Sequence, residues 1–315
     1  MSKKYSVGVD IGGTTVKMGL FKVEGELLDS WEIVTRKEEG GCYILGDIAD
    51  SIQEKLKKKK IDKNDIAGIG LGVPGPITED GTVLKCANLG WGVFQVADEV
   101  RKLTGVENVK VNNDANVAAL GEMWQGGGRG YKNLVMVTLG TGVGGGIIVN
   151  GRILTGSNGA AGEIGHITVN EEEEFRCGCG KQGCLEQYAS ATGLVKETKR
   201  ALNNTDGPSL LREIQYLSAK SVFDAAKEGD SLANELVDMF ADYLGLALSH
   251  VAAVVDPEVF VIGGGVSRAG EMLTERIKAA YENKVMFALK NKEFKLAELG
   301  NDAGIYGSAK MVLDD

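Results

Sequence analysis

The sequence predicts an α/β protein built from two related domains, and three observations lead to this prediction. The chain has 315 residues, more than one hydrophobic core usually organises. Strand-like and helix-like segments follow one another along it. One pattern also occurs twice: VGVDIG at 7–12 matches VMVTLG at 135–140, and GELL at 25–28 matches GRIL at 151–154. A repeat of roughly 130 residues is too long for a solenoid unit. It indicates two domains, each opening with a β-hairpin whose glycine turn faces a shared cleft.

The elements follow from local pattern. Apolar, β-branched residues on both sides of Gly12-Gly13 predict the first hairpin, and residues from 134 onward predict the second. An amphipathic pattern predicts a helix over 43–60, and a continuous apolar run predicts a buried strand over 66–73 that ends at Pro74. The later elements are a helix over 232–255 that ends before Pro257, a strand over 259–262 and a closing helix over 303–313.

Composition excludes several classes of protein. Hydrophobic residues make up 43% and charged residues 25% of the chain, as in ordinary globular proteins. The net charge of -9 argues against a nucleic-acid partner. The N-terminal MSKKYSVGVD lacks the apolar core of a signal peptide, and no apolar run approaches the roughly 20 residues of a membrane span. We therefore expect a cytoplasmic protein with no membrane partner, whose clustered cysteines bind a metal or act in catalysis rather than form disulfides.

Glycine-rich turns are the first sign of function. The chain has 45 glycines, and three glycine turns follow predicted strands. Backbone N–H groups in such turns suit a polyphosphate, and Asp10 adds a carboxylate able to hold Mg²⁺, directly or through water. No turn matches a P-loop or a Rossmann motif, and packing alone better explains any single turn. The repeat favours a ligand, and the candidate cofactor-binding residues are Asp10, Gly12, Gly13, Thr14, Lys17, Gly140, Thr141, Gly142, Gly263, Gly264 and Gly265.

A second sign is the stretch EIGHITVNEEEEFRCGCGKQGCLE at 163–186, which holds one of two histidines and three of five cysteines. Its Cys₃His set is typical of a closed tetrahedral zinc site, so the zinc would be structural rather than catalytic. Free cysteines or a catalytic thiol are the less favoured alternatives. The glutamates at both ends are either hydroxyl acceptors or surface carboxylates, and the acidic run 171–174 is expected to be solvated. The candidate metal ligands are His166, Cys177, Cys179 and Cys184.

Residues 112–119, NNDANVAA, open a helical pattern. An Asp or Asn immediately before a helix is most often an N-cap. From the residues alone, the capping role of Asn113 and Asp114 is therefore stronger than a catalytic one.

Three patterns together resemble a known family. DIGGT, TLGTGxGGG and GExGH followed by CxCGxxGCxE are similar to motifs of the ROK family (repressors, ORFs and kinases), from residue 6 to about 312. The resemblance implies the duplicated actin/hexokinase-like (ribonuclease H-like) ATPase fold. We expect residues 1–115 with 300–315 to form a smaller domain, and 116–299 a larger one with the zinc loop. Family repressors carry an N-terminal helix-turn-helix domain, for which we expect no room before the first strand.

The resemblance also implies a function. The expected reaction is ATP-dependent phosphorylation of the 6-hydroxyl of a hexose, and the NLGW segment favours glucose. Asp114 matches the catalytic aspartate, which accepts the proton of the attacking hydroxyl. The ring nitrogen of His166 that does not bind zinc would donate to a sugar hydroxyl. The implied cofactors are ATP, Mg²⁺ and structural Zn²⁺, the implied assembly is a homodimer, and the implied sugar-binding residues are Gly75, Asn88, Asn113, Asp114, Glu163, His166 and Glu186.

Other functions remain open. Kinases of the same family act on N-acetylglucosamine, N-acetylmannosamine or mannose, and differ in the space around carbon 2. A sugar-sensing regulator without catalysis is a second class, and an actin-like filament protein is a third. The intact Asp114 and the cysteine motif count against these last two.

Overall fold

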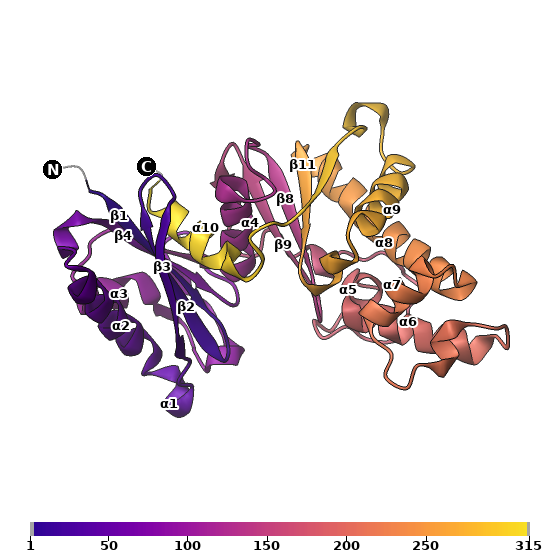
Figure 1. Cartoon of the computed structure of the whole chain (residues 1–315), viewed down its shortest axis with the longest axis horizontal. Helices are drawn as coiled ribbons and strands as arrows, with labels where there is room; N and C mark the ends of the chain where they lie inside the picture. Colours follow the sequence, from indigo (N-terminus) through magenta and orange to yellow (C-terminus); the bar gives the residue numbers. More distant parts are fainter. Residues whose placement is uncertain (1–2, 314–315) are drawn as a thin grey trace. The chain divides into compact units, whose positions relative to one another are not determined.

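The computed structural model describes residues 3–313 and has two mixed β-sheets with helices around them (Figure 1). The strands are β1 Tyr5–Ile11, β2 Thr15–Lys22, β3 Leu27–Val34, β4 Ile66–Val73, β5 Thr82–Val83, β6 Phe94–Gln95, β7 Val109–Asn113, β8 Leu134–Leu139, β9 Val143–Val149, β10 Arg152–Ile153, β11 Val259–Gly263 and β12 Glu293–Leu296. The helices are α1 Glu38–Gly41, α2 Ile44–Lys59, α3 Val96–Thr104, α4 Asp114–Gln125, α5 Glu186–Ala189, α6 Ala191–Asn204, α7 Ala219–Lys227, α8 Ser231–Val255, α9 Glu271–Glu282 and α10 Ala303–Met311.

The two large sheets repeat one topology. Their strand orders are β3-β2-β1-β4-β7 and β10-β9-β8-β11-β12. β1 pairs with β4 in parallel, as β8 does with β11, and the next pairs outward, β4 with β7 and β11 with β12, are parallel too. The repeat predicted from the sequence is thus confirmed, and it extends to five strands in each half.

The chain divides into two compact units. The first comprises Met1–Lys132, Gly146–Gly162 and Glu298–Asp315, and the second comprises Asn133–Gly145 and Glu163–Ala297. This division differs from the boundary expected at residue 115, because helix α4 packs against α10 within the first unit. The carboxylate of Glu122, buried in α4, also accepts the backbone N–H groups of Glu298 (3.0 Å) and Leu299 (2.8 Å) where the chain re-enters this unit.

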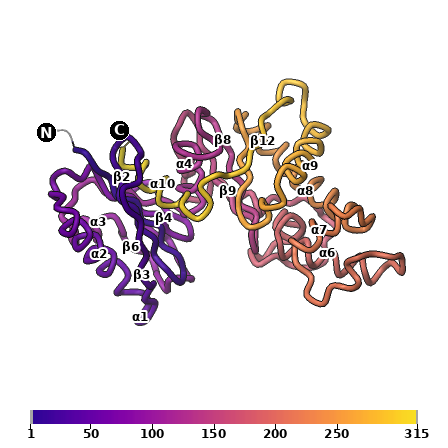
Figure 2. Tube along the Cα trace, in the orientation of Figure 1, coloured from indigo at the N-terminus to yellow at the C-terminus, as the bar shows by residue number. Residues whose placement is uncertain are grey.

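The first sheet has two different faces. One face is apolar and packs on α2 and α3 through residues such as Val7 and Ile69. On the other face glycine alternates with these residues, and α10 lies directly on the backbone. A Cβ on Gly8 would overlap the carbonyl oxygen of Ile305, and a Cβ on Gly70 would overlap that of Ser308. Figure 2 shows α2 and α3 on one side of this sheet and α10 on the other. Asp10 lies on the α10 face because side chains alternate along β1.

The second unit is built around β8, β11 and the long helix α8. Helix α8 packs against α7 and α9, and Phe260, Tyr281 and Phe294 form an aromatic cluster at centroid distances of 4.9 to 5.4 Å. Within the described chain, α8 is the one helix long and apolar enough to cross a membrane by length and composition, although the sequence predicted no such run. Over half of its most apolar window, 56%, is buried inside the protein. This burial is typical of a core helix.

Candidate active site and metal centre

Two carboxylates come together at the end of β1. Asp10 lies near the end of that strand, next to the first turn of α10 at Gly304, and Asp114 is the first residue of α4. Burial, and after it repulsion from Asp114, raises the pKa of Asp10 to about 6, although the Lys17 ammonium opposes both effects. The two negative charges therefore interact, and a divalent cation would relieve their repulsion.

The first glycine turn, Gly12–Thr15, lies beside Asp10 and is braced by a residue that the sequence did not single out. Thr35 donates its hydroxyl to the Gly12 carbonyl (2.7 Å) and its backbone N–H to the Thr14 carbonyl (2.9 Å). It follows β3 directly, and no motif marks it. The Lys17 ammonium, predicted to bind cofactor, pairs with Asp302 at 2.5 Å.

Asn113 is the N-cap of α4. Its Oδ1 accepts the N–H groups of Ala115 (2.9 Å) and Asn116 (3.3 Å), and its Nδ2 donates to the Gly75 carbonyl (3.1 Å). Capping and a role in a site are therefore compatible, since the cap holds the adjacent Asp114 at the helix start.

The turn that carries Asn88 lies near Asn113 and Asp114. Asn88 is exposed in a short 3-10 turn, Ala87–Leu89, which follows Cys86. The buried Trp91 closes this turn by pairing with Cys86. Burial raises the pKa of Cys86, and the charge of Asp114 contributes to that shift. The predicted residues Gly75, Asn88, Asn113 and Asp114 thus cluster within the first unit.

In the second unit, two predicted glycine turns end neighbouring strands. Gly263 of β11 is paired with Thr138 of β8, and Gly264 packs on the backbone of Leu139. The turns Gly140–Gly142 and Gly263–Gly265 are therefore adjacent. The Glu186 carboxylate also holds the first of them, because its Oε2 accepts the backbone N–H of Val143 at 3.0 Å.

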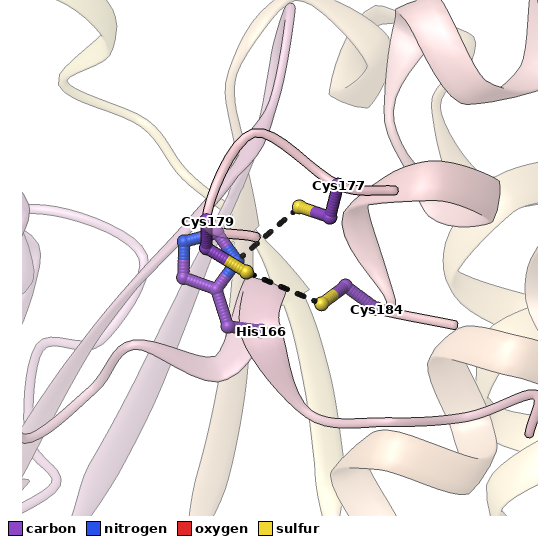
Figure 3. A group of neighbouring side chains, drawn as sticks. All are labelled: His166, Cys177, Cys179 and Cys184. Atoms are coloured by element: carbon purple, nitrogen blue, oxygen red, sulfur yellow. Dashed lines mark hydrogen bonds between the residues drawn. The ribbon is translucent and has the colours of Figure 1, made fainter. Parts of the chain in front are cut away.

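His166 and the three cysteines of the motif form one cluster (Figure 3). Their ligand atoms all lie within 4.8 Å of one another. The Sγ atoms of Cys179 and Cys184 are 3.6 Å apart, and Cys177 Sγ is 3.7 Å from His166 Nδ1. Ligands of a tetrahedral zinc stand about 3.5 to 3.8 Å apart, given bonds of about 2.3 Å to sulfur and about 2.0 Å to nitrogen. The four residues thus fit such an ion.

The histidine ring is oriented by this cluster. With Nδ1 toward Cys177, its Nε2 lies 3.9 Å from an oxygen of Glu163. The other flanking carboxylate, Glu186, has Oε1 3.9 Å from Cys177 Sγ. Both flanking glutamates therefore lie next to the cluster rather than apart from it.

The acidic run was interpreted wrongly at one position. Glu171, Glu172 and Glu174 are exposed as expected, but the Glu173 side chain is only 2% exposed and accepts five hydrogen bonds. The sequence gives no signal that separates it from its neighbours.

Comparison with known proteins agrees with the family resemblance seen in the sequence. The pattern that defines the ROK family matches residues 6–315. Glucokinase of Halalkalibacterium halodurans is 46% identical over 317 residues, covering 99% of this chain and 96% of that protein.

The chain belongs to the ROK family.

Solved structures of ROK proteins agree with this assignment. A ROK-family glucokinase from Streptomyces griseus, in complex with glucose and AMPPNP, is 33% identical with a TM-score of 0.72, covering 98% of both chains. A ROK hexokinase from Thermus thermophilus is 31% identical with a TM-score of 0.81, covering 97% of each chain. The predicted fold is confirmed: two mixed α/β halves of the actin/hexokinase-like type.

The contribution of Asp10 to the stability of this ROK protein falls as pH rises. The folded carboxyl, with its pKa near 6, holds its proton more tightly than the unfolded one at 3.8. The protonated Asp10 therefore stabilises the folded protein below about pH 4, and this contribution is lost as pH rises to about 6.

We expect Asp10→Asn to raise the free energy of unfolding, measured by urea denaturation without Mg²⁺, by about 2 to 3 kcal/mol near pH 8. The gain should be smaller near pH 5. Glu107→Gln, at an exposed carboxylate, is the control. A gain independent of pH would contradict this account.

Proposed function

We propose that this protein transfers the γ-phosphoryl group of ATP to the 6-hydroxyl of glucose. The observation that carries the proposal is the pair of carboxylates, Asp10 and Asp114, beside the Gly12–Thr15 turn. The glucokinases among its relatives support the choice of sugar. Phosphoryl transfer needs little covalent chemistry from the protein, so positioning and charge stabilisation account for most of the catalysis.

Asp114 is the proposed general base. Its carboxylate accepts the proton of the 6-hydroxyl while O6 attacks the γ-phosphorus, and the bond from that phosphorus to the β,γ-bridging oxygen breaks to release ADP. Asn113 holds Asp114 at the start of α4 through its cap. Asp10 is the residue that would hold Mg²⁺, which neutralises phosphate charge when bound.

The proposed ATP ligands are backbone N–H groups of the glycine turns at 12–14, 140–142 and 263–265. The Lys17 ammonium pairs with Asp302, so a phosphate would share it or compete for it with that carboxylate. The proposed sugar ligands are hydrogen-bonding groups that a buried sugar must satisfy: Gly75, Asn88, Asn113, Glu163, His166 and Glu186.

We further propose that the Cys₃His cluster holds zinc in a structural role. Four protein ligands leave no open position for a substrate. A zinc ion held by Nδ1 of His166 would fix the tautomer, so Nε2 would carry the hydrogen and donate it to a sugar hydroxyl. The expected homodimer and cytoplasmic location stay predictions.

The function is tested by measuring kcat/KM at a fixed ATP concentration for five sugars: glucose, mannose, N-acetylglucosamine, N-acetylmannosamine and fructose. We expect glucose to lead by about tenfold or more, since a misplaced hydroxyl leaves a buried partner unpaired at about 1 to 3 kcal/mol. If an N-acetylated sugar has the highest kcat/KM, the protein is still a sugar kinase, but its assignment as a glucokinase is wrong. Binding without turnover of any sugar would favour the sugar-sensing regulator.

Replacing the general base separates binding from chemistry. Asp114→Asn keeps the shape of the side chain but removes the proton acceptor, so kcat is expected to fall by at least about 10² to 10⁴-fold. Glucose binding, measured by calorimetry without ATP, should change little. Asp98→Asn, at an exposed residue of α3, is the matched control. Near-normal kcat in Asp114→Asn would assign the base to another group.

Metal removal tests the zinc proposal. We expect about one zinc per chain by elemental analysis, and Cys179→Ser should lower that content and weaken glucose binding far more than ATP binding. Cys42→Ser, an exposed thiol outside the cluster, is the control. Equal loss of both affinities would instead indicate global unfolding.

A further inference from the structure

One glutamate of the acidic run has surroundings unlike those of its neighbours. Glu173 is buried, with a side chain 2% exposed, whereas Glu172 and Glu174 are exposed. A buried carboxylate is costly unless it is paired and hydrogen-bonded. The contacts around Glu173 meet that requirement.

Its two oxygens accept hydrogen bonds from four residues. Tyr188 Oη donates at 2.6 Å, Lys196 Nζ at 3.2 Å, Arg200 Nη1 and Nη2 at 3.2 and 3.0 Å, and the Phe175 backbone N–H at 3.0 Å. The Arg200 guanidinium holds the pKa of Glu173 far below its usual range. The charged form is therefore the one that the structure stabilises.

These contacts join the cysteine loop to the body of the second unit. Lys196 and Arg200 belong to helix α6, and Tyr188 belongs to the single turn α5, Glu186–Ala189. The Tyr188 hydroxyl also accepts a hydrogen bond from Asn170 (2.9 Å), and its ring stacks on Tyr243 of α8 at 4.3 Å. Tyr188 is thus fixed on three sides, and Glu173 makes the shortest of its hydrogen bonds.

The same short turn carries Glu186, two residues before Tyr188. Glu186 accepts the Val143 N–H and lies 3.9 Å from Cys177 Sγ. The segment from His166 to Tyr188 is thus held at two places: the cysteine cluster at one, and Glu173 with its cations at the other. The metal ligands orient His166, and α5 is held by hydrogen bonds that Tyr188 donates to Glu173 and Gln187 donates to the Phe175 carbonyl.

We propose that Glu173 is a positioning residue for sugar binding, acting through Tyr188 on the orientation of Glu186. This inference rests on the proposed function, since it assumes that Glu186 binds the sugar. Loss of the carboxylate charge removes the acceptor of Lys196 and of the Tyr188 hydroxyl and leaves Arg200 with Glu197 alone, so α5 is held less firmly in its orientation. Asp114 is not part of this network, whereas the Gly140–Gly142 turn meets it through the Val143 N–H that Glu186 accepts.

The experiment compares Glu173→Gln and Tyr188→Phe with two controls from the same run, Glu172→Gln and Glu174→Gln. Tyr188→Phe removes only the hydroxyl and leaves the ion pairs of Glu173 in place. We expect Glu173→Gln to raise the glucose Kd, measured by calorimetry without ATP, and the glucose KM by about tenfold. Tyr188→Phe should raise both in the same direction. In each, kcat should stay within about threefold, and the controls should match the wild type.

A double-mutant cycle tests the route through Tyr188. If Glu173 acts through that hydroxyl, the double variant should bind glucose about as weakly as Glu173→Gln alone. Additive effects would overturn the proposed route. Lower thermal stability of Glu173→Gln with unchanged glucose Kd would show a structural role only and overturn the proposal. If the wild type neither binds nor phosphorylates any sugar, the proposed function fails instead.

Discussion

The close approach of helix α10 to the first sheet is the constraint on which the first unit depends. No side chain fits between the helix and β1 or β4 at Gly8 and Gly70, so the helix lies on the strand backbones. Helix α4 approaches α10 equally closely, since a Cβ on Gly307 would overlap the Val117 carbonyl. Close packing of this kind tolerates little displacement. It fixes Asp10, at the end of β1, next to the start of α4, where Asp114 lies.

Elements and motifs with a local cause could be predicted from the sequence. The apolar runs gave β4 and β11, and the amphipathic pattern gave α2, each within about two residues of its observed bounds. The Cys₃His set was recognisable because its spacing is specific, and the structure brings all four ligands together. The duplicated topology was visible as a weak repeat, because both hairpins need glycine at the same turn.

Features set by distant contacts could not be predicted. Nothing in the sequence distinguishes Glu173 from Glu172, because its burial depends on Lys196 and Arg200 more than 20 residues away. The brace that Thr35 provides depends on β3 ending beside the first glycine turn. The domain boundary was displaced for a similar reason: α4 belongs to the first unit through its packing on α10, which is remote in sequence.

The division of the chain also bears on how the protein is made. The polypeptide passes between the two units four times, after residues 132, 145, 162 and 297. Because α10 is translated after the whole of the second unit, the ribosome has already released residues 163–297 before the first sheet can receive its covering helix. Until then the glycine face of β1 and β4 lacks the helix that covers Gly8 and Gly70, and long-range contacts of this kind form slowly. The fold therefore makes completion of the first sheet one of the last events of synthesis.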